Sequence, residues 1–374
     1  MIRPGQRQIG KEGRESEREK KLSFEFGVST ISKMELSKYK KKFQPKFLET
    51  DKPNKESLDK NGDAFLTMPE IGVFAVLDGV GGDSSDPALA SDEAKNHLRE
   101  ILSSNSNDQR SLSEEIEFLK EAVVQTHEYL LSKRPVEKKR FRKQTEGQFL
   151  VTTLVLAKIW RNPRVVDEIK VITVNVGDSR VYMSVDEQLN QITVDHSRFN
   201  FQIPEYYRQK VLANNGPDIK RKFENITSKK QSEELKKLFD SYRHLYNLLP
   251  PFDPTDYFVF RNLISAALGG NNNEGNILNK IDVKINDLPA NESKPVSSPE
   301  EAAQMLVDRA ILLGLCKKTD NYSRHKGDDT TALVVDVKLN NIVATRLLLI
   351  TDGVNDNLTL DQIEESVLDL NPQI

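Results

Sequence analysis

The sequence predicts an α+β domain, built as a sandwich of mostly antiparallel β-sheets flanked by helices. Apolar runs with the length of strands come in blocks ahead of the helical segments, whereas a parallel α/β fold would alternate strictly. Some runs are wholly apolar and others alternate apolar with polar residues, as strands do when one or both sheet faces are buried. The 374 residues suffice for one large domain or two ordinary ones.

The N-terminal part divides by composition. Residues 1–23 are charged and nearly devoid of apolar side chains, so we expect them to be disordered. The folded domain is then expected to span residues 24–374. It would begin with a strand at 24–33, and a Lys-rich insertion near 34–60 would follow.

Two strands and two helices are expected next. The strands lie within Asp63–Leu77 and are separated by a turn at a Pro-Glu dipeptide. Apolar residues near helical spacing predict a helix over Pro87–Leu102 and a second over Glu114–Ser132. His127 lies on the apolar face of the second helix, and we interpret it as a core or boundary histidine rather than a ligand.

The middle of the chain contains more strands and a long insertion. A basic loop at 133–146 precedes strands rich in β-branched residues at 149–160, 169–185 and 188–194. Residues 198–260 are polar and aromatic, and we expect them to form a flap-like insertion with short helices.

Two helices near the C-terminus carry explicit start signals. Ser298 is followed three residues later by Glu301, and Thr359 is followed at the same spacing by Gln362. This spacing is that of a capping box, in which each side chain bonds the backbone N–H of the other residue.

Composition excludes several classes of protein. A net charge of -3 implies no strong field for nucleic acid or a membrane surface. The single cysteine, Cys316, excludes an intrachain disulfide and fits a reducing compartment such as the cytoplasm. No apolar run approaches the roughly 18 residues of a transmembrane segment, and no signal-peptide pattern opens the chain. Export without a cleaved signal peptide stays open, and we expect a monomer.

Two acidic signatures carry the strongest functional signal. Asp78 ends the apolar run of FAVLDGVGG (74–82), and Asp352 ends that of LLLITDGVND (347–356). The Gly after each Asp permits a sharp turn, so each carboxylate is presented at the C-terminal edge of a core strand. Paired carboxylates of this kind are what a site for hard divalent cations requires.

Three further Asp-containing turns also border apolar runs. They lie in NGDAF (61–65), VITVNVGDSRVYM (171–183) and GDDTTALVVDV (327–337). One such turn by itself is most simply a plain turn. Five of them, each at the end of an apolar run, favour a metal site.

Seven segments together resemble the metal-dependent type-2C serine/threonine protein phosphatases, the PPM family. FAVLDGVGG is similar to the family's Asp-Gly-x-Gly-Gly motif, and VNVGDSRVYM resembles its Gly-Asp-Ser-Arg hairpin. The other matching segments are VTTLVLAKI (151–159), QITVDHS (191–197), RNLISAALGG (261–270), GDDTTALVV and LLLITDGVND. The resemblance covers about residues 24–374.

The resemblance implies a four-layer αββα fold, in which helices cover both outer faces of a central β-sandwich. It also implies two Mg²⁺ or Mn²⁺ ions, with a possible third at a weaker site. The positions that match the family's ligands are Asp63, Asp78, Asp328, Asp352 and the carbonyl of Gly79, with Asp178 and Asp356 for the third ion. The implied activity is Mg/Mn-dependent hydrolysis of phosphoserine and phosphothreonine in phosphoprotein substrates by a metal-bridged hydroxide, with Asp78 and Asp352 as catalytic residues.

The chain departs from the family at two ligand positions. Gly62 stands where the family has Glu, and Leu58 stands where it has the Arg that binds phosphate. Lys60 is the candidate replacement for that Arg, although a lysine cannot hold phosphate bidentately. Two alternatives therefore stay open: a catalytically degenerate relative that binds metal or phosphoprotein, and a scaffold that uses the basic N-terminus and the 198–260 insertion.

The order of two segments also differs. In the family the strand with Ser-Asp-Gly precedes the strand with Asp-Asn, whereas here GDDTTALVVDV comes first. Exchanging residues 285–338 with 339–374 would restore the family order. The sheet then forms only if the new connections can reach.

Overall fold

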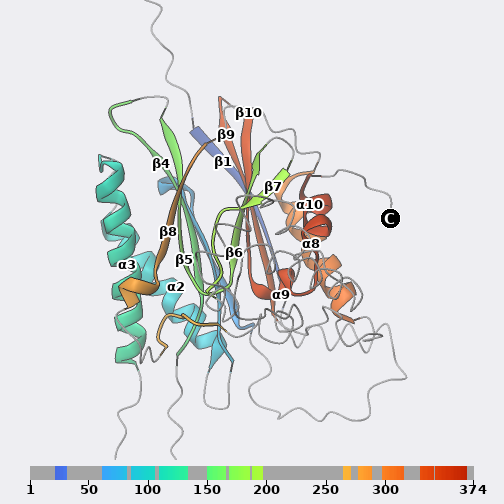
Figure 1. The fold of residues 1–374 in the computed structure, drawn as a ribbon, viewed down its shortest axis with the longest axis horizontal. Helices are drawn as coiled ribbons and strands as arrows, with labels where there is room; N and C mark the ends of the chain where they lie inside the picture. The colour runs from blue at the N-terminus through green and yellow to red at the C-terminus, as the bar shows by residue number, and fades with distance from the viewer. Residues whose placement is uncertain are drawn as a thin grey trace, which may run out of the picture.

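The structure, a computed structural model, describes residues 22–31, 61–81, 86–105, 109–133, 150–165, 168–185, 188–196, 264–270, 277–288, 297–315, 329–340 and 342–368. Within them, two five-stranded sheets pack face to face, and helices cover the outer face of each sheet (Figure 1). The predicted four-layer αββα sandwich is confirmed.

The two sheets are antiparallel throughout the described pairings. The first has the order β1-β9-β10-β6-β7, comprising Leu22–Ile31, Thr330–Leu339, Ile342–Ile350, Arg180–Val185 and Gln188–Gln191. The second has the order β2-β3-β4-β5-β8, comprising Asp63–Met68, Val73–Asp78, Leu154–Arg161, Ile169–Val176 and Asp282–Asp287.

The helices divide between the two outer faces. α2 (Pro87–Ser104) and α3 (Leu112–Ser132) lie on the second sheet, whereas α8 (Pro299–Leu315), α9 (Asp352–Asn355) and α10 (Leu360–Leu368) belong to the side of the first (Figure 1). The 3₁₀ turns η1 (Pro69–Ile71) and η2 (Ile277–Lys280) complete the elements.

Three apolar clusters explain the strand patterns. Phe74 and Leu349 belong to the cluster between the sheets, and their neighbours along the chain, Ala75 and Leu348, belong to clusters beneath the helices. Because both faces of these central strands are buried, β3 and β10 are almost entirely apolar rather than alternating. None of the described helices has the length and apolar character needed to cross a membrane.

The predicted helix starts and the buried histidine are confirmed. Ser298 and Glu301 exchange bonds, with Ser298 N donating to Glu301 Oε2 at 3.0 Å and Glu301 N to Ser298 Oγ at 3.2 Å. Thr359 and Gln362 form the same arrangement ahead of α10. His127 is buried, and its Nδ1 accepts a hydrogen bond from Gly269 N at 3.0 Å.

The expected hairpin at VNVGDSRVYM was wrong. β5 pairs with β4 and β8, whereas β6 pairs with β10 and β7, so the Gly-Asp-Ser turn carries the chain from one sheet to the other. Val171 of β5 and Val181 of β6 both belong to the cluster between the sheets. Gly177 makes the turn possible because its φ of 124° is unfavourable for residues with a side chain.

Some boundaries differ from the predicted ones. β1 begins at Leu22 rather than at residue 24. β4 begins only at Leu154, because Thr152 instead bridges Gly79 and Leu268. β8 was not predicted as a strand. The predicted Lys-rich insertion and the predicted flap-like insertion both lie outside the described residues.

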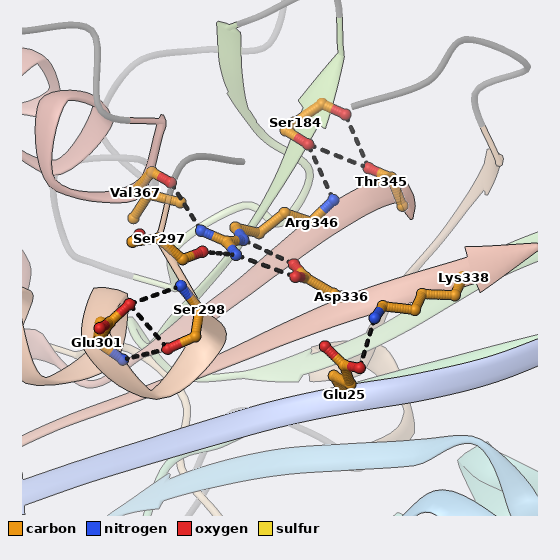
Figure 2. Close-up of polar contacts among 10 residues, drawn as sticks. All are labelled: Glu25, Ser184, Ser297, Ser298, Glu301, Asp336, Lys338, Thr345, Arg346 and Val367. Carbon is orange, nitrogen blue, oxygen red and sulfur yellow. Dashed lines mark hydrogen bonds and ion pairs between the residues drawn. The ribbon is translucent and has the colours of Figure 1, made fainter. Parts of the chain in front are cut away.

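The unusual segment order is accommodated by a tight hairpin. β9 pairs directly with β10, with Leu339 opposite Ile342, and Asn340 adopts the left-handed conformation that two-residue hairpin loops favour (φ 52°). A second contact joins the segments 285–338 and 339–374. The guanidinium of Arg346 donates to Ser297 O, before α8 in the first segment, and to Val367 O, in α10 of the second (Figure 2). The two segments therefore contact each other, and β9 and β10 pair as neighbours in chain order.

Candidate metal centre at one end of the sandwich

Asp63 and Asp78 are brought to the same end of one sheet by strand pairing. Asp63 is the first residue of β2 and lies opposite Asp78, the last residue of β3. Beyond this pair, Gly79 N donates to Gly62 O at 3.0 Å. The register thus places the two predicted ligands side by side without any contribution from a loop.

The backbone of Asp78 is fixed by the segment before β4. Thr153 N and Thr152 Oγ1 both donate to Asp78 O, at 2.7 and 2.9 Å, and Asp78 N donates to Thr153 Oγ1 at 3.1 Å. Thr153 Oγ1 also lies 2.8 Å from Ser179 Oγ. These contacts place Asp178, the residue before Ser179, near the same end of the sandwich.

Gly79 is required by close packing. A Cβ added to Gly79 would lie 2.1 Å from Pro87 O and 2.7 Å from Gly62 O, so no other residue fits without moving backbone. The Asp-Gly pair therefore lets the start of α2 approach the strand end, as expected for a site held on a rigid scaffold.

The opposite sheet contributes a second set of acidic residues. Thr351 Oγ1 donates to Asp63 Oδ2 at 2.8 Å and accepts from Thr331 N at 3.0 Å, which joins the ends of β9 and β10 to β2. Asp352 follows Thr351 as the first residue of α9. Asp356 ends this short helix one turn later, where its N donates to Asp352 O at 2.7 Å.

Asp63 is the electrostatic centre of the cluster. Burial raises the pKa of Asp63 well above its usual range, and the negative charges of Asp329 and Asp352 raise the pKa further. Hydrogen bonds from Thr331 and Thr351 oppose this shift without cancelling it. Asp63 Oδ1 is buried and finds no hydrogen-bond partner among the described residues.

These observations fit a site for a hard divalent cation. All the donors are oxygens, and a cation would satisfy the buried Asp63 oxygen and offset the repulsion between carboxylates. Within the described part of the chain, however, no three His, Cys, Asp or Glu side chains already stand in a metal-holding arrangement. The predicted ligand Asp328 and the predicted phosphate contact Lys60 lie outside the described residues.

Sequence reasoning missed Asp329. It carries one of the charges acting on Asp63, and its Oδ2 accepts a hydrogen bond from Gly62 N at 2.8 Å. The available signal was the Asp-Asp doublet at the start of β9, from which only Asp328 was assigned as a ligand.

The raised pKa of Asp63 predicts a pH-dependent cost to stability when metal is chelated. Near pH 3, Asp63 is largely protonated in both the folded and the unfolded protein. As the pH rises, the unfolded chain releases this proton first, because the pKa of Asp63 is raised in the folded protein. The free energy of unfolding therefore falls as the pH rises through the folded-state pKa. Asp63→Asn should therefore stabilise the chelated protein more at pH 7.5 than at pH 4. Urea unfolding in EDTA measures this, with exposed Asp92→Asn as the control. An Asp63→Asn effect that is equal at both pH values would contradict it.

Comparison with known proteins gives structural matches only. No protein-family model matches the chain, and no curated protein matches it either. Among solved structures, the chain is similar to PppA, described as a key regulatory component of T6SS in Pseudomonas aeruginosa, with 18% identity, a TM-score of 0.40, and 85% of this chain and 100% of that chain covered.

Two further structures are serine/threonine phosphatases. PstP/Ppp from Mycobacterium tuberculosis has 13% identity and a TM-score of 0.42, with 88% of this chain and 98% of that chain covered. Stp1 from Staphylococcus aureus has 16% identity and a TM-score of 0.41, with 91% and 99% covered. The solved structures that this chain resembles over most of its length thus include bacterial serine/threonine phosphatases, at low sequence identity.

Proposed function

We propose that the chain is a metal-dependent phosphatase that hydrolyses phosphoserine and phosphothreonine in proteins. The observation that carries the proposal is the buried Asp63 carboxylate, which faces the charges of Asp329 and Asp352 and retains an oxygen with no hydrogen-bond partner among the described residues. This arrangement is unfavourable by itself and becomes favourable when positive charge is bound.

The residues proposed to hold Mg²⁺ or Mn²⁺ are those of the sandwich end. Asp63, Asp78, Asp352 and the Gly79 carbonyl would bind two ions together with Asp328, and Asp178 with Asp356 would serve a third. Bound divalent cations would neutralise phosphate charge and lower the pKa of a coordinated water towards neutrality.

The chain's own residues prepare this site before metal arrives. Threonine hydrogen bonds fix the Asp78 backbone, and Thr351 orients the Asp63 carboxylate by donating to Oδ2. Asp352 begins α9, with only Thr351 between it and the buried strand β10. Lys60 is proposed to contact the substrate phosphate as a point charge.

The direct test is hydrolysis of p-nitrophenyl phosphate and of a phosphothreonine peptide. Activity should require added Mn²⁺ or Mg²⁺ and be lost in EDTA, because carboxylates without a cation repel the phosphate dianion. Restoration by Mn²⁺ after EDTA treatment excludes damage by the chelator. Absence of Mn²⁺-stimulated hydrolysis of either substrate would refute the catalytic assignment.

A catalytically degenerate domain that binds metal or phosphoprotein is the second candidate. Two observations favour it: Gly62 supplies no side-chain ligand, and the described carboxylates do not already form a three-residue metal site. Mn²⁺ binding by calorimetry, without turnover of either substrate, would identify this case.

A further inference from the structure

Asp329 reaches from one sheet to the other at the sandwich end. It directly precedes β9, and its Oδ2 accepts a hydrogen bond from Gly62 N at 2.8 Å, beside the start of β2. Its backbone packs closely against the start of α9, because a Cβ on Gly353 would lie 2.0 Å from Asp329 O. The residue thus bonds β2 through its side chain and packs against α9 through its backbone.

The Asp329 carboxylate occupies the space that a side chain of residue 62 would need. A Cβ added to Gly62 would lie 2.7 Å from Asp329 Oδ2 and 3.2 Å from Pro87 Cβ. The two positions therefore compete for one space. Because residue 62 is a glycine, the carboxylate of Asp329 can fill this space.

An independent observation places a buried carboxylate oxygen without a hydrogen-bond donor next to this space. Asp63, next to Gly62, is only 8% exposed, and its Oδ1 has no hydrogen-bond partner among the described residues. A buried carboxylate oxygen without a donor is costly, and a second carboxylate nearby increases that cost unless a cation lies between them.

We infer that Asp329 is an oxygen donor to the cation bound beside Asp63, and that it supplies the carboxylate that residue 62 does not. The inference rests on the proposed metal centre. It assigns to Asp329 a role that neither the motif resemblance nor the ligand positions Asp63, Asp78 and Asp352 require. It also accounts for the coexistence of Gly62 with an Asp-Asp doublet before β9.

The first test is Mn²⁺ titration of the full chain by calorimetry. Asp329→Asn keeps an oxygen that can accept from Gly62 N but removes the charge, and we expect the Mn²⁺ dissociation constant to rise by about 10-fold to 100-fold. Asp308→Asn, an equivalent change on the exposed side of α8 beside Gln304, should leave the constant unchanged. Unfolding of both variants in EDTA checks that any loss of binding is not loss of fold.

The second test moves the carboxylate without removing a charge. Gly62→Ala should push the Asp329 side chain aside, because the nearest obstacle to the new Cβ is the end of that side chain. It should weaken Mn²⁺ binding in the wild-type background and add little to Asp329→Asn, as expected for two changes acting through one group. Gly62→Glu combined with Asp329→Ala frees the contested space and returns a carboxylate from the other side, and we expect it to bind Mn²⁺ more tightly than Asp329→Ala alone.

The outcomes separate this inference from the proposed function. If wild type binds Mn²⁺ and both Asp329→Asn and Gly62→Ala bind it equally well, the role of Asp329 is refuted and the metal centre stands. If wild type binds no Mn²⁺, the metal centre and the inference both fail. If Asp329→Asn does not fold in EDTA, the Gly62→Ala titration decides alone.

Discussion

Asp78→Asn should reduce Mn²⁺-dependent phosphatase activity by more than about 100-fold, which exceeds the 10-fold to 100-fold typical of residues that only support a ligand. The reason is charge: asparagine retains one oxygen at the same place but lacks the negative charge, so it attracts a divalent cation much more weakly. The strand pairing of Asp78 with Asp63 and the threonine bonds to the Asp78 backbone do not depend on its carboxylate. The fold should therefore persist.

The measurement is kcat/KM for the phosphothreonine peptide across a range of Mn²⁺ concentrations. Asp92→Asn, on an exposed part of α2 where the carboxylate pairs with Lys95, should remain fully active. Far-ultraviolet circular dichroism and urea unfolding should show little change in either variant. Full activity of Asp78→Asn at all metal concentrations would show that the chemistry takes place elsewhere.

The layers of the fold could be predicted from the sequence because both signals were local. Wholly apolar runs such as Val73–Leu77 identify strands buried on both faces, and the Ser298–Glu301 spacing identifies a helix start. The partner of each strand was not local. A Gly-Asp-Ser turn fits a hairpin and a crossing between sheets equally well, so β5 and β6 were assigned to one sheet and lie in two.

The candidate site shows the same division. The Asp-Gly signature predicts Asp78 and Asp352 at strand ends; Asp78 does end β3, whereas Asp352 lies two residues beyond β10, at the start of α9. The relation of Asp329 to Gly62 joins residues 267 positions apart, and no spacing rule reveals it. The edge strand β8 was missed because its residues are mostly partly exposed or exposed, which weakens the apolar signal of a strand.

The buried side chain of Arg346, away from the candidate metal site, should contribute strongly to the free energy of unfolding. Arg346, on β10, is fully buried and binds Asp336 of β9 through two bonds, from Nε to Oδ1 at 2.7 Å and from a terminal nitrogen to Oδ2 at 3.0 Å. Its guanidinium also donates to Val367 O at 2.9 Å and to Ser297 O at 2.7 Å (Figure 2). One side chain thus connects the first sheet to α10 and to the start of α8.

Arg346→Ala should lower the free energy of unfolding by about 3–5 kcal/mol, because it leaves the buried Asp336 charge uncompensated and two carbonyls without this donor. Urea unfolding with constant metal concentration measures the loss. The matched control is Arg309→Ala, which removes a partly exposed link from α8 to Gln362 O, Ser366 Oγ and Glu365 of α10. It leaves no buried charge unpaired, so it should cost only about 1–2 kcal/mol.

A double variant separates the buried charge from simple loss of packing. Arg346→Met with Asp336→Leu replaces the ion pair by apolar side chains, and such replacements are often neutral, so most of the lost stability should return. The carbonyls of Ser297 and Val367 would still lack this donor, so recovery should be incomplete. Equal, small losses for Arg346→Ala and Arg309→Ala would contradict this account. They would show that α8 and α10 are attached to the first sheet by apolar packing, and that the hydrogen bonds of Arg346 contribute little to stability.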